Sequence, residues 1–191
     1  EEASPLIPPP TPTDYVPEAE YWDRYYERTD DDLLYEWNDG ILEEKPMADR
    51  ESYQLFSWFH KLTDEYLKAY PVGNMVGLEI GFRMALPGKT SVRKPDLAVI
   101  LETNRIQMGL AERSYRGIFD LCVEFLSDSK PEEVRRDTIE KKNEYCLAGV
   151  REYFILDRKG RETAFYRLTQ GIYTPILPNS DGVICSTILP G

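Results

Sequence analysis

Hydrophobic positions recur along the chain with two periods, which predicts both helices and strands. From about Arg50 to Ala69 the apolar residues follow the three- and four-residue spacing of an amphipathic helix, which Pro71 is expected to end. A second helix is predicted from about Val134 to Ala148, with Gly149 at its C-terminal cap. Short apolar runs surround these helices, so the pattern favours a mixed α/β (α+β) sheet.

The short apolar runs predict the strands and their turns. Leu33 to Lys45 is expected to form a hairpin, because Asp39-Gly40 favours the positive φ angles of a two-residue turn. Met75 to Leu86 is predicted to be a single strand that contains Glu79, followed by a turn at Pro87-Gly88. Further strands are expected at 97–101, 121–126, 153–156 and 163–168, with a hairpin turn at Gly171 and strand fragments in the tail 173–191.

The ends of the chain differ from its middle. Residues 1–17 contain six prolines and little that could be buried, which predicts an extended or disordered arm. Residues 18–191 are predicted to form one domain, a size that can bury a substantial core. At its start, residues 18–32 mix acids with aromatic residues, and we expect an amphipathic helix or docking segment with the aromatics facing the core. A contact with a peptide or partner is the alternative.

Charge is distributed unevenly. The 191 residues have a net charge of -11, which argues against tight non-specific binding to nucleic acid. Residues 1–82 hold 19 acidic and 6 basic residues, whereas residues 83–161 hold 13 acidic and 16 basic ones. Residues 162–191 hold 2 acidic residues and 1 basic residue. Of these three segments, 83–161 is therefore the only one without an acidic excess, and it carries the candidate chemistry described below.

Cysteine usage and hydropathy suggest a cytoplasmic protein. The three cysteines are odd in number and form no CxxC pair, as expected of a reduced protein without a structural zinc site. Neither a signal-peptide pattern nor an apolar run of the roughly 20 residues needed to span a bilayer is found. The single histidine, His60, cannot by itself form a histidine metal site or a Ser-His-Asp triad, and we interpret it as structural.

Two acids and one lysine suggest phosphodiester chemistry. Asp96 begins one apolar run, and Glu124 lies inside another, LCVEFL, where a charge is costly unless it is paired or metal-bound. Magnesium binds such carboxylates, and the carbonyl of Phe125 could add a third oxygen. Lys141, on the second helix with Asp137 and Tyr145 at i-4 and i+4, would orient or help deprotonate the attacking water. Each residue also has a purely structural interpretation: a strand-start acid, a paired strand acid and one of many helix lysines.

The segments KPDLAVI, LCVEFLSDS and RRDTIEKKNEYCLAGVREYFILD together resemble the restriction-endonuclease-like family abundant in cyanobacteria. This family was long catalogued as a domain of unknown function and is placed in the PD-(D/E)XK nuclease superfamily. LLYEWNDGILEE and GRETAFYRL resemble its hairpin and late strand, so the similarity covers about residues 33–190. It implies a PD-(D/E)XK core, a mixed four-stranded sheet flanked by helices, with an added N-terminal hairpin and C-terminal strands.

The resemblance also implies roles for single residues. The family's aspartate, glutamate and lysine fall on Asp96, Glu124 and Lys141, with Asp96 and Glu124 as the metal ligands. The superfamily's usual lysine position, two residues after the acid, is Leu126 here, and Lys142 is the second choice for the lysine. The family's first-helix histidine falls on Tyr53, and an assisting acid from that helix would be Asp49 or Glu51, a choice that stays open.

The resemblance implies an endonuclease that uses Mg²⁺ or Mn²⁺ to hydrolyse DNA, with a homodimer as one arrangement for cutting both strands. A catalytically idle nucleic-acid or protein interaction module on the same fold is the first alternative, which the net charge favours. Hydrolysis of another phosphate compound is the second, because a fold does not fix a substrate.

Overall fold

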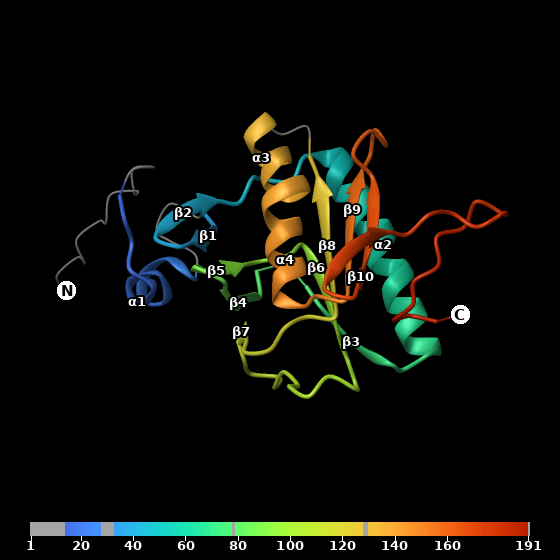
Figure 1. The fold of residues 1–191 in the computed structure, drawn as a ribbon, viewed down its shortest axis with the longest axis horizontal. Helices are drawn as coiled ribbons and strands as arrows, with labels where there is room; N and C mark the ends of the chain where they lie inside the picture. Colours follow the sequence, from blue (N-terminus) through green and yellow to red (C-terminus); the bar gives the residue numbers. More distant parts are fainter. Residues whose placement is uncertain (1–13, 28–32, 78, 128–129, 191) are drawn as a thin grey trace.

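The computed structural model of the chain describes residues 14–27, 33–77, 79–127 and 130–190. These residues form two mixed β-sheets with helices packed on them (Figure 1). The six-stranded sheet has the order β11-β10-β9-β8-β6-β3, and the five-stranded sheet has the order β2-β1-β5-β4-β7. The strands of the first are β3 (Gly73–Val76), β6 (Leu97–Leu101), β8 (Leu121–Leu126), β9 (Glu152–Asp157), β10 (Ala164–Thr169) and β11 (Ile172–Pro175). Those of the second are β1 (Tyr35–Asn38), β2 (Ile41–Glu44), β4 (Gly81–Leu86), β5 (Lys89–Arg93) and β7 (Ser114–Tyr115).

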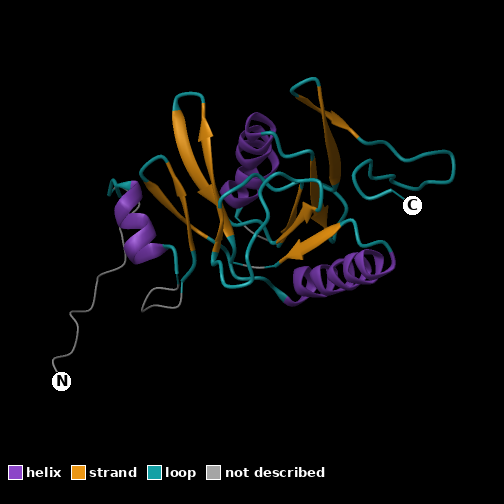
Figure 2. Cartoon of the chain, turned by 90° about the horizontal axis from the view of Figure 1, so that it is seen from below, coloured by secondary structure: helices purple, strands orange, loops and turns teal. Residues whose placement is uncertain are grey.

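The six-stranded sheet carries helices on both faces (Figure 2). Strands β8 and β9 are parallel and are joined by one continuous helical segment, which consists of α3 (Pro131–Arg135), a π-helical stretch η2 (Arg136–Lys141) and α4 (Lys142–Ala148). This segment packs on one face through residues such as Tyr145, and α2 (Arg50–Ala69) packs on the other through Leu55, Phe56 and Phe59. The expected mixed sheet flanked by helices is therefore confirmed.

Several local predictions are confirmed. Helix α2 has the predicted bounds, and the Asp49 side chain caps it by accepting a hydrogen bond from the Ser52 amide at 2.7 Å. The β1–β2 hairpin turns at Asp39 and Gly40, whose φ angles are 49° and 99°. Gly149 ends α4 with a φ of 94°, in the left-handed region that glycine adopts without strain.

The prediction of one strand from Met75 to Leu86 is wrong. The segment forms β3 and β4, which belong to different sheets. Glu79 lies between them with a φ of 75°, a left-handed conformation that interrupts an extended strand. Strand β5 was not expected either, because its sequence KTSVR is polar. It buries Ser91 and Arg93 completely, and Arg93 is buried only because carboxylates surround it, as described below.

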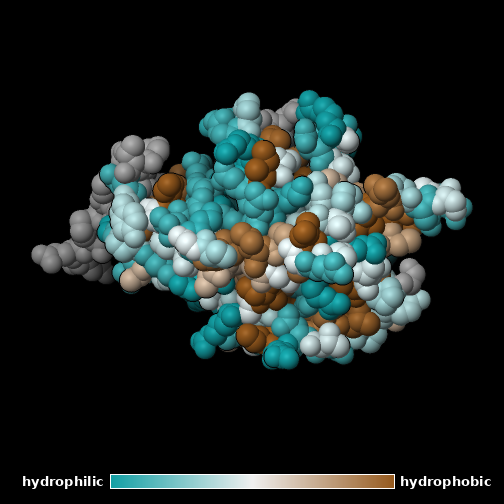
Figure 3. All heavy atoms as spheres, in the orientation of Figure 1, coloured by the Kyte–Doolittle hydropathy of each residue, from teal (hydrophilic) through white to brown (hydrophobic). Residues whose placement is uncertain are grey.

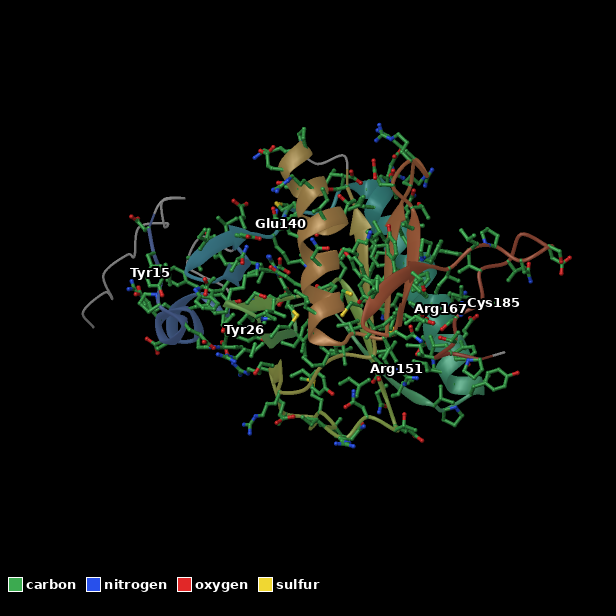
Figure 4. All side chains as sticks on the ribbon, viewed as in Figure 1. Tyr15, Tyr26, Glu140, Arg151, Arg167 and Cys185 are labelled. Atoms are coloured by element: carbon green, nitrogen blue, oxygen red, sulfur yellow. The ribbon has the colours of Figure 1, made fainter. Side chains whose placement is uncertain are left out.

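The two ends of the chain pack partly as predicted. In the segment α1 (Glu18–Glu20) and η1 (Tyr21–Tyr25), Tyr21 and Tyr25 are buried and Trp22 is half-buried against the same cluster. Tyr26, which directly follows η1, is buried as well, so the aromatics of this segment face the core as predicted. Tyr26 lies beside the five-stranded sheet (Figure 4), where its hydroxyl accepts a hydrogen bond from the Gly81 amide at 2.8 Å. Residues 1–13 of the expected arm and residues 28–32 lie outside the described part of the chain.

The tail forms only one of the expected strand fragments, β11. Beyond β11, residues 176–190 contain no strand. They are held instead by side chains: Ile176 and Ile188 join the core under α2, and Glu152 accepts hydrogen bonds from Ser186 and Thr187. On the face seen in Figure 1, hydrophobic residues lie in small patches among hydrophilic ones (Figure 3). Within the described ranges, none of the helices has the length and apolar character needed to cross a bilayer.

Candidate active site

A cavity of about 100 Å³ lies where the six-stranded sheet, the β8–β9 helical connection, α2 and the end of the β1–β2 hairpin meet. All three candidate catalytic residues line it. Three acids and three bases contribute to its wall: Asp96, Glu124, Asp137, Lys45, Arg136 and Lys141. The structure thus brings together residues from four separate parts of the chain.

Glu124 lies on the face of β8 that is covered by the helical connection. Side chains alternate along β8, so Leu121, Val123 and Phe125 pack toward α2, while Glu124 shares the opposite face with Cys122. Glu124 is 1% exposed. Its Oε1 accepts a hydrogen bond from the Tyr145 hydroxyl at 2.9 Å and lies 3.1 Å from Nζ of Lys141. The strand acid is therefore paired and held in one orientation.

Asp96 lies just before β6 and is fixed from two sides. Its Oδ2 accepts a hydrogen bond from the Phe125 amide at 2.9 Å, which ties Asp96 to the residue after Glu124 on the neighbouring strand. Its Oδ1 accepts a hydrogen bond from Nζ of Lys45 at 2.7 Å. The pairing of β6 with β8 explains why two acids so distant in sequence face one cavity.

Lys141 is surrounded by three carboxylates. Its Nζ lies 3.0 Å from Oδ1 of Asp137, 3.1 Å from Oε1 of Glu124 and 3.2 Å from Oε1 of Glu36. The predicted helix face is present, since Asp137 and Tyr145 contact Lys141 and Glu124 respectively. The neighbouring lysine, Lys142, points elsewhere and lies over the ring of Tyr166, 4.1 Å from its centroid.

Burial and charge shift the pKa values of these groups. Burial is the main cause that raises the pKa of Glu124 to about 8; Lys141 opposes this shift, while Asp96 and Asp137 add to it. The pKa of Asp137 is raised for the same main reason, burial. Burial alone would lower the pKa of Lys141, but the carboxylates of Asp137, Glu124 and Glu36 outweigh it and raise that pKa well above its usual range. Lys141 is therefore a protonated, positively charged group in the metal-free chain.

A buried charge network behind the cavity was not anticipated from the sequence. Glu36 of β1 is completely buried, and besides Lys141 it contacts Arg93 at 3.3 Å and accepts a hydrogen bond from the Lys94 amide at 2.7 Å. Arg93 in turn pairs with Glu144 of α4 at 2.6 Å. A signal for Glu36 did exist, because it interrupts the apolar run LLYEW just as Glu124 interrupts LCVEFL. Arg93 and Lys45 had no comparable signal.

The candidate residues of the first helix have different surroundings. Tyr53, at the family's histidine position, lines the cavity. Asp49 and Glu51 do not line it; they border a separate, smaller hollow with Asp157, and Asp49 serves as the cap of α2. His60 packs beside Phe56, with ring centroids 5.6 Å apart, and is likewise outside the cavity lining.

The cavity offers hard oxygen ligands for a divalent cation. In the described part of the chain no group of three or more histidine, cysteine or acidic side chains is arranged to hold a metal. Mg²⁺, however, commonly takes one or two carboxylates from the protein and fills its other positions with water and substrate oxygens. Asp96 and Glu124 fit that demand. Burial is the main cause of the raised pKa of Glu124, and repulsion from Asp96 and Asp137 adds to it. A cation between the carboxylates would relieve that repulsion.

Comparison with known proteins identifies the family of the chain and a solved structure with a similar fold. Residues 20–191 match the model of the Uma2 family, described as "Putative restriction endonuclease". Among solved structures, a crystal structure of "a putative nuclease belonging to DUF820" from Anabaena variabilis ATCC 29413 superposes with a TM-score of 0.61 at 18% identity, covering 82% of this chain and 83% of that one. At this identity the likeness shows the fold. A search of curated proteins finds no match. The chain belongs to the Uma2 family and has a restriction-endonuclease-like fold.

Proposed function

We propose that this protein is a metal-dependent endonuclease that hydrolyses phosphodiester bonds of DNA. The observation that carries the proposal is the convergence of Asp96, Glu124 and Lys141 on one cavity, where each is held by hydrogen bonds or ion pairs. Family membership supports the reaction class, since the family's description is "Putative restriction endonuclease".

Asp96 and Glu124 would hold the metal, Mg²⁺ or Mn²⁺. When bound, the ion supplies Lewis acidity, which activates water and offsets the charge of the phosphate. The Phe125 amide keeps Asp96 directed at the cavity, and the Tyr145 hydroxyl does the same for Glu124. Neither acid then has to be reoriented to act as a ligand.

Lys141 would act as a fixed hydrogen-bond donor. Its three carboxylate neighbours keep it protonated, which favours orienting the attacking water and neutralising phosphate charge over removing a proton. Asp137, one helical turn before it, restricts its side chain. Lys142 cannot take this role in the observed conformation, because it lies on Tyr166.

Two alternative functions predict different results for metal binding and DNA cleavage. An idle interaction module on the same fold would bind a partner without binding metal. A hydrolase of another phosphate compound would bind metal without cutting DNA. The net charge of -11 favours the first alternative. The convergent acids of the cavity favour the endonuclease and the second alternative equally, because both need the metal.

The test combines metal titration with cleavage. Mg²⁺ and Mn²⁺ are titrated calorimetrically into the wild-type protein and Glu124→Ala, and plasmid and single-stranded DNA are incubated with the same preparations. Binding and cleavage that both vanish in the variant support the endonuclease. Binding without cleavage indicates another phosphate substrate, and a wild-type protein that binds no metal indicates the interaction module.

Location and assembly are also part of this proposal. We place the protein in the cytoplasm, in keeping with its three free cysteines, of which Cys122 is buried. We further propose a homodimer, because a single cavity faces one scissile phosphate while a duplex has two strands. Light scattering with and without DNA measures this oligomeric state directly.

A further inference from the structure

Lys45 occupies the position at Asp96 that a metal would need. Its Nζ donates hydrogen bonds to Oδ1 of Asp96 at 2.7 Å and to the carbonyl oxygen of Lys94 at 2.5 Å. The Lys45 side chain is 11% exposed and lines the same cavity as Glu124 and Lys141. A positive charge from the added hairpin thus binds the carboxylate oxygen that faces the cavity.

The backbone holds Lys45 in this place. Its amide donates to the carbonyl oxygen of Leu34 at 2.7 Å, which extends the hairpin pairing by one residue beyond Glu44. Pro46 follows and restricts the conformation of Lys45 to the extended region. The contact of 2.7 Å between Nζ and Oδ1 of Asp96 is a charge-assisted hydrogen bond between an ammonium group and a carboxylate.

From this geometry we propose that Lys45 is a built-in competitor of the metal: it neutralises Asp96 in the metal-free chain and must leave Oδ1 before a divalent cation can bind there. The inference rests on the proposed metal site at Asp96 and Glu124. It adds a residue that sets the metal affinity of that site and comes from the hairpin rather than from the core sheet.

Removing Lys45 should leave Asp96 correctly oriented. The second carboxylate oxygen keeps its hydrogen bond from the Phe125 amide, which belongs to the rigid pairing of β6 with β8. The freed Oδ1 then faces the cavity without a competing ammonium. A neutral side chain at position 45 is therefore expected to strengthen metal binding rather than weaken it.

Arg136 provides a matched control within the same cavity. It also carries a positive charge and lines the cavity, but it contacts the hairpin instead of Asp96: its Nη1 donates to the carbonyl oxygen of Glu44 at 2.8 Å and lies 3.7 Å from Oε2 of Glu43. Loss of this charge changes the general potential of the cavity without freeing Asp96.

The experiment is calorimetric titration of Mn²⁺, without DNA, into the wild-type protein, Lys45→Met, Lys45→Gln, Lys45→Arg and Arg136→Met. Circular dichroism first establishes that each variant is folded, and two neutral replacements guard against loss of one to misfolding. We expect Mn²⁺ to bind about tenfold more tightly to both neutral Lys45 variants, since they lack a unit charge beside the ligand. Lys45→Arg should stay near wild type, and Arg136→Met should change the affinity less than about threefold.

The outcomes separate this inference from the proposed function. Equal affinity in wild type and the neutral Lys45 variants, or weaker affinity in the variants, overturns the inference and leaves the metal site intact. An Arg136→Met gain as large as that of Lys45→Met also overturns it, because the effect is then general electrostatics. If no variant and no wild-type protein binds Mn²⁺, both the inference and the metal-dependent function fail.

Discussion

Nζ of Lys141 lies 3.2 Å from Oε1 of Glu36, which joins the helical connection of the six-stranded sheet to β1 of the five-stranded sheet. Both side chains are buried. The candidate catalytic lysine therefore depends for its position on a hairpin outside the core sheet. Glu36 is itself held by Arg93 and the Lys94 amide, so the two sheets meet through a network of charges behind the cavity.

Glu36→Gln should destabilise the fold and change its response to acid. Burial opposes ionisation of Glu36, but Lys141, Arg93 and Lys45 together lower its pKa from 4.5 to about 2. A depressed pKa contributes stability that is present above the unfolded-state value and is lost as the pH falls toward 2. Loss of this charge leaves Arg93 and Lys141 under-paired, so we expect about 3 kcal/mol less stability at pH 7.

Urea unfolding at pH 7, 4 and 3 checks this prediction. The variant should lose less stability than wild type between pH 4 and pH 3, because it lacks the titrating group. Glu65→Gln is the control, since Glu65 lies on α2 with a side chain 64% exposed. If the free energy of unfolding falls equally with decreasing pH in wild type and Glu36→Gln, the assigned charge network is contradicted.

Glu124→Gln should make the metal-free protein less sensitive to alkali. The pKa of Glu124 is raised from 4.5 to about 8, chiefly by burial. A raised pKa contributes stability that is complete below the unfolded-state value and is lost as the pH rises through the folded-state value. Wild type should therefore lose on the order of 2 kcal/mol between pH 5 and pH 9 in EDTA, and the variant much less.

Thermal unfolding in EDTA across that pH range measures the difference. Glutamine keeps an oxygen that can accept the hydrogen bond from Tyr145, so packing changes little. The same scans with excess Mg²⁺ should remove the alkaline loss in wild type only, because bound metal stabilises the ionised carboxylate. A variant that loses as much stability as wild type would place the titrating group elsewhere.

Lys141→Met and its neighbour Lys142→Met form a matched pair. Lys141→Met should reduce DNA cleavage at least about a hundredfold, because it removes the charge that we propose neutralises the phosphate. Lys142→Met should keep near-wild-type cleavage, since Lys142 lies on Tyr166 instead of in the cavity. Initial rates on supercoiled plasmid, at a temperature where both variants are folded, give the comparison. Equal losses in the two variants would remove Lys141 from the mechanism.

Asp96→Ala and Glu124→Ala should each abolish metal-dependent cleavage without unfolding the protein. Each removes one of the two cavity carboxylates that we propose as metal ligands. Glu140→Ala is the control: Glu140 precedes Lys141 on the same helical connection (Figure 4) but pairs with Arg135 and does not line the cavity. Cleavage by either variant at the wild-type rate would falsify the assigned site.

Some of the architecture was readable from the sequence because local physics determines it. The apolar spacing of 50–69 defines α2, and the Asp39-Gly40 pair defines the hairpin turn. Conversely, Glu79 gave no local sign that the chain leaves one sheet for the other there, although its φ of 75° lies in the left-handed region. The polar strand β5 could not be predicted from its own sequence, because its buried arginine needs acids from β1 and α4.

By itself, the sequence determined the helices, most strands, the family and the three residues proposed to carry the chemistry, since these depend on periodicity, on turn residues and on charges placed within apolar runs. Only the tertiary structure decided that Lys141 faces three carboxylates, that Lys45 lies on Asp96, and that Asp49 caps a helix outside the cavity. These contacts join residues distant in the sequence. Their energies arise from shared burial and charge, which exist only after the two sheets have packed together.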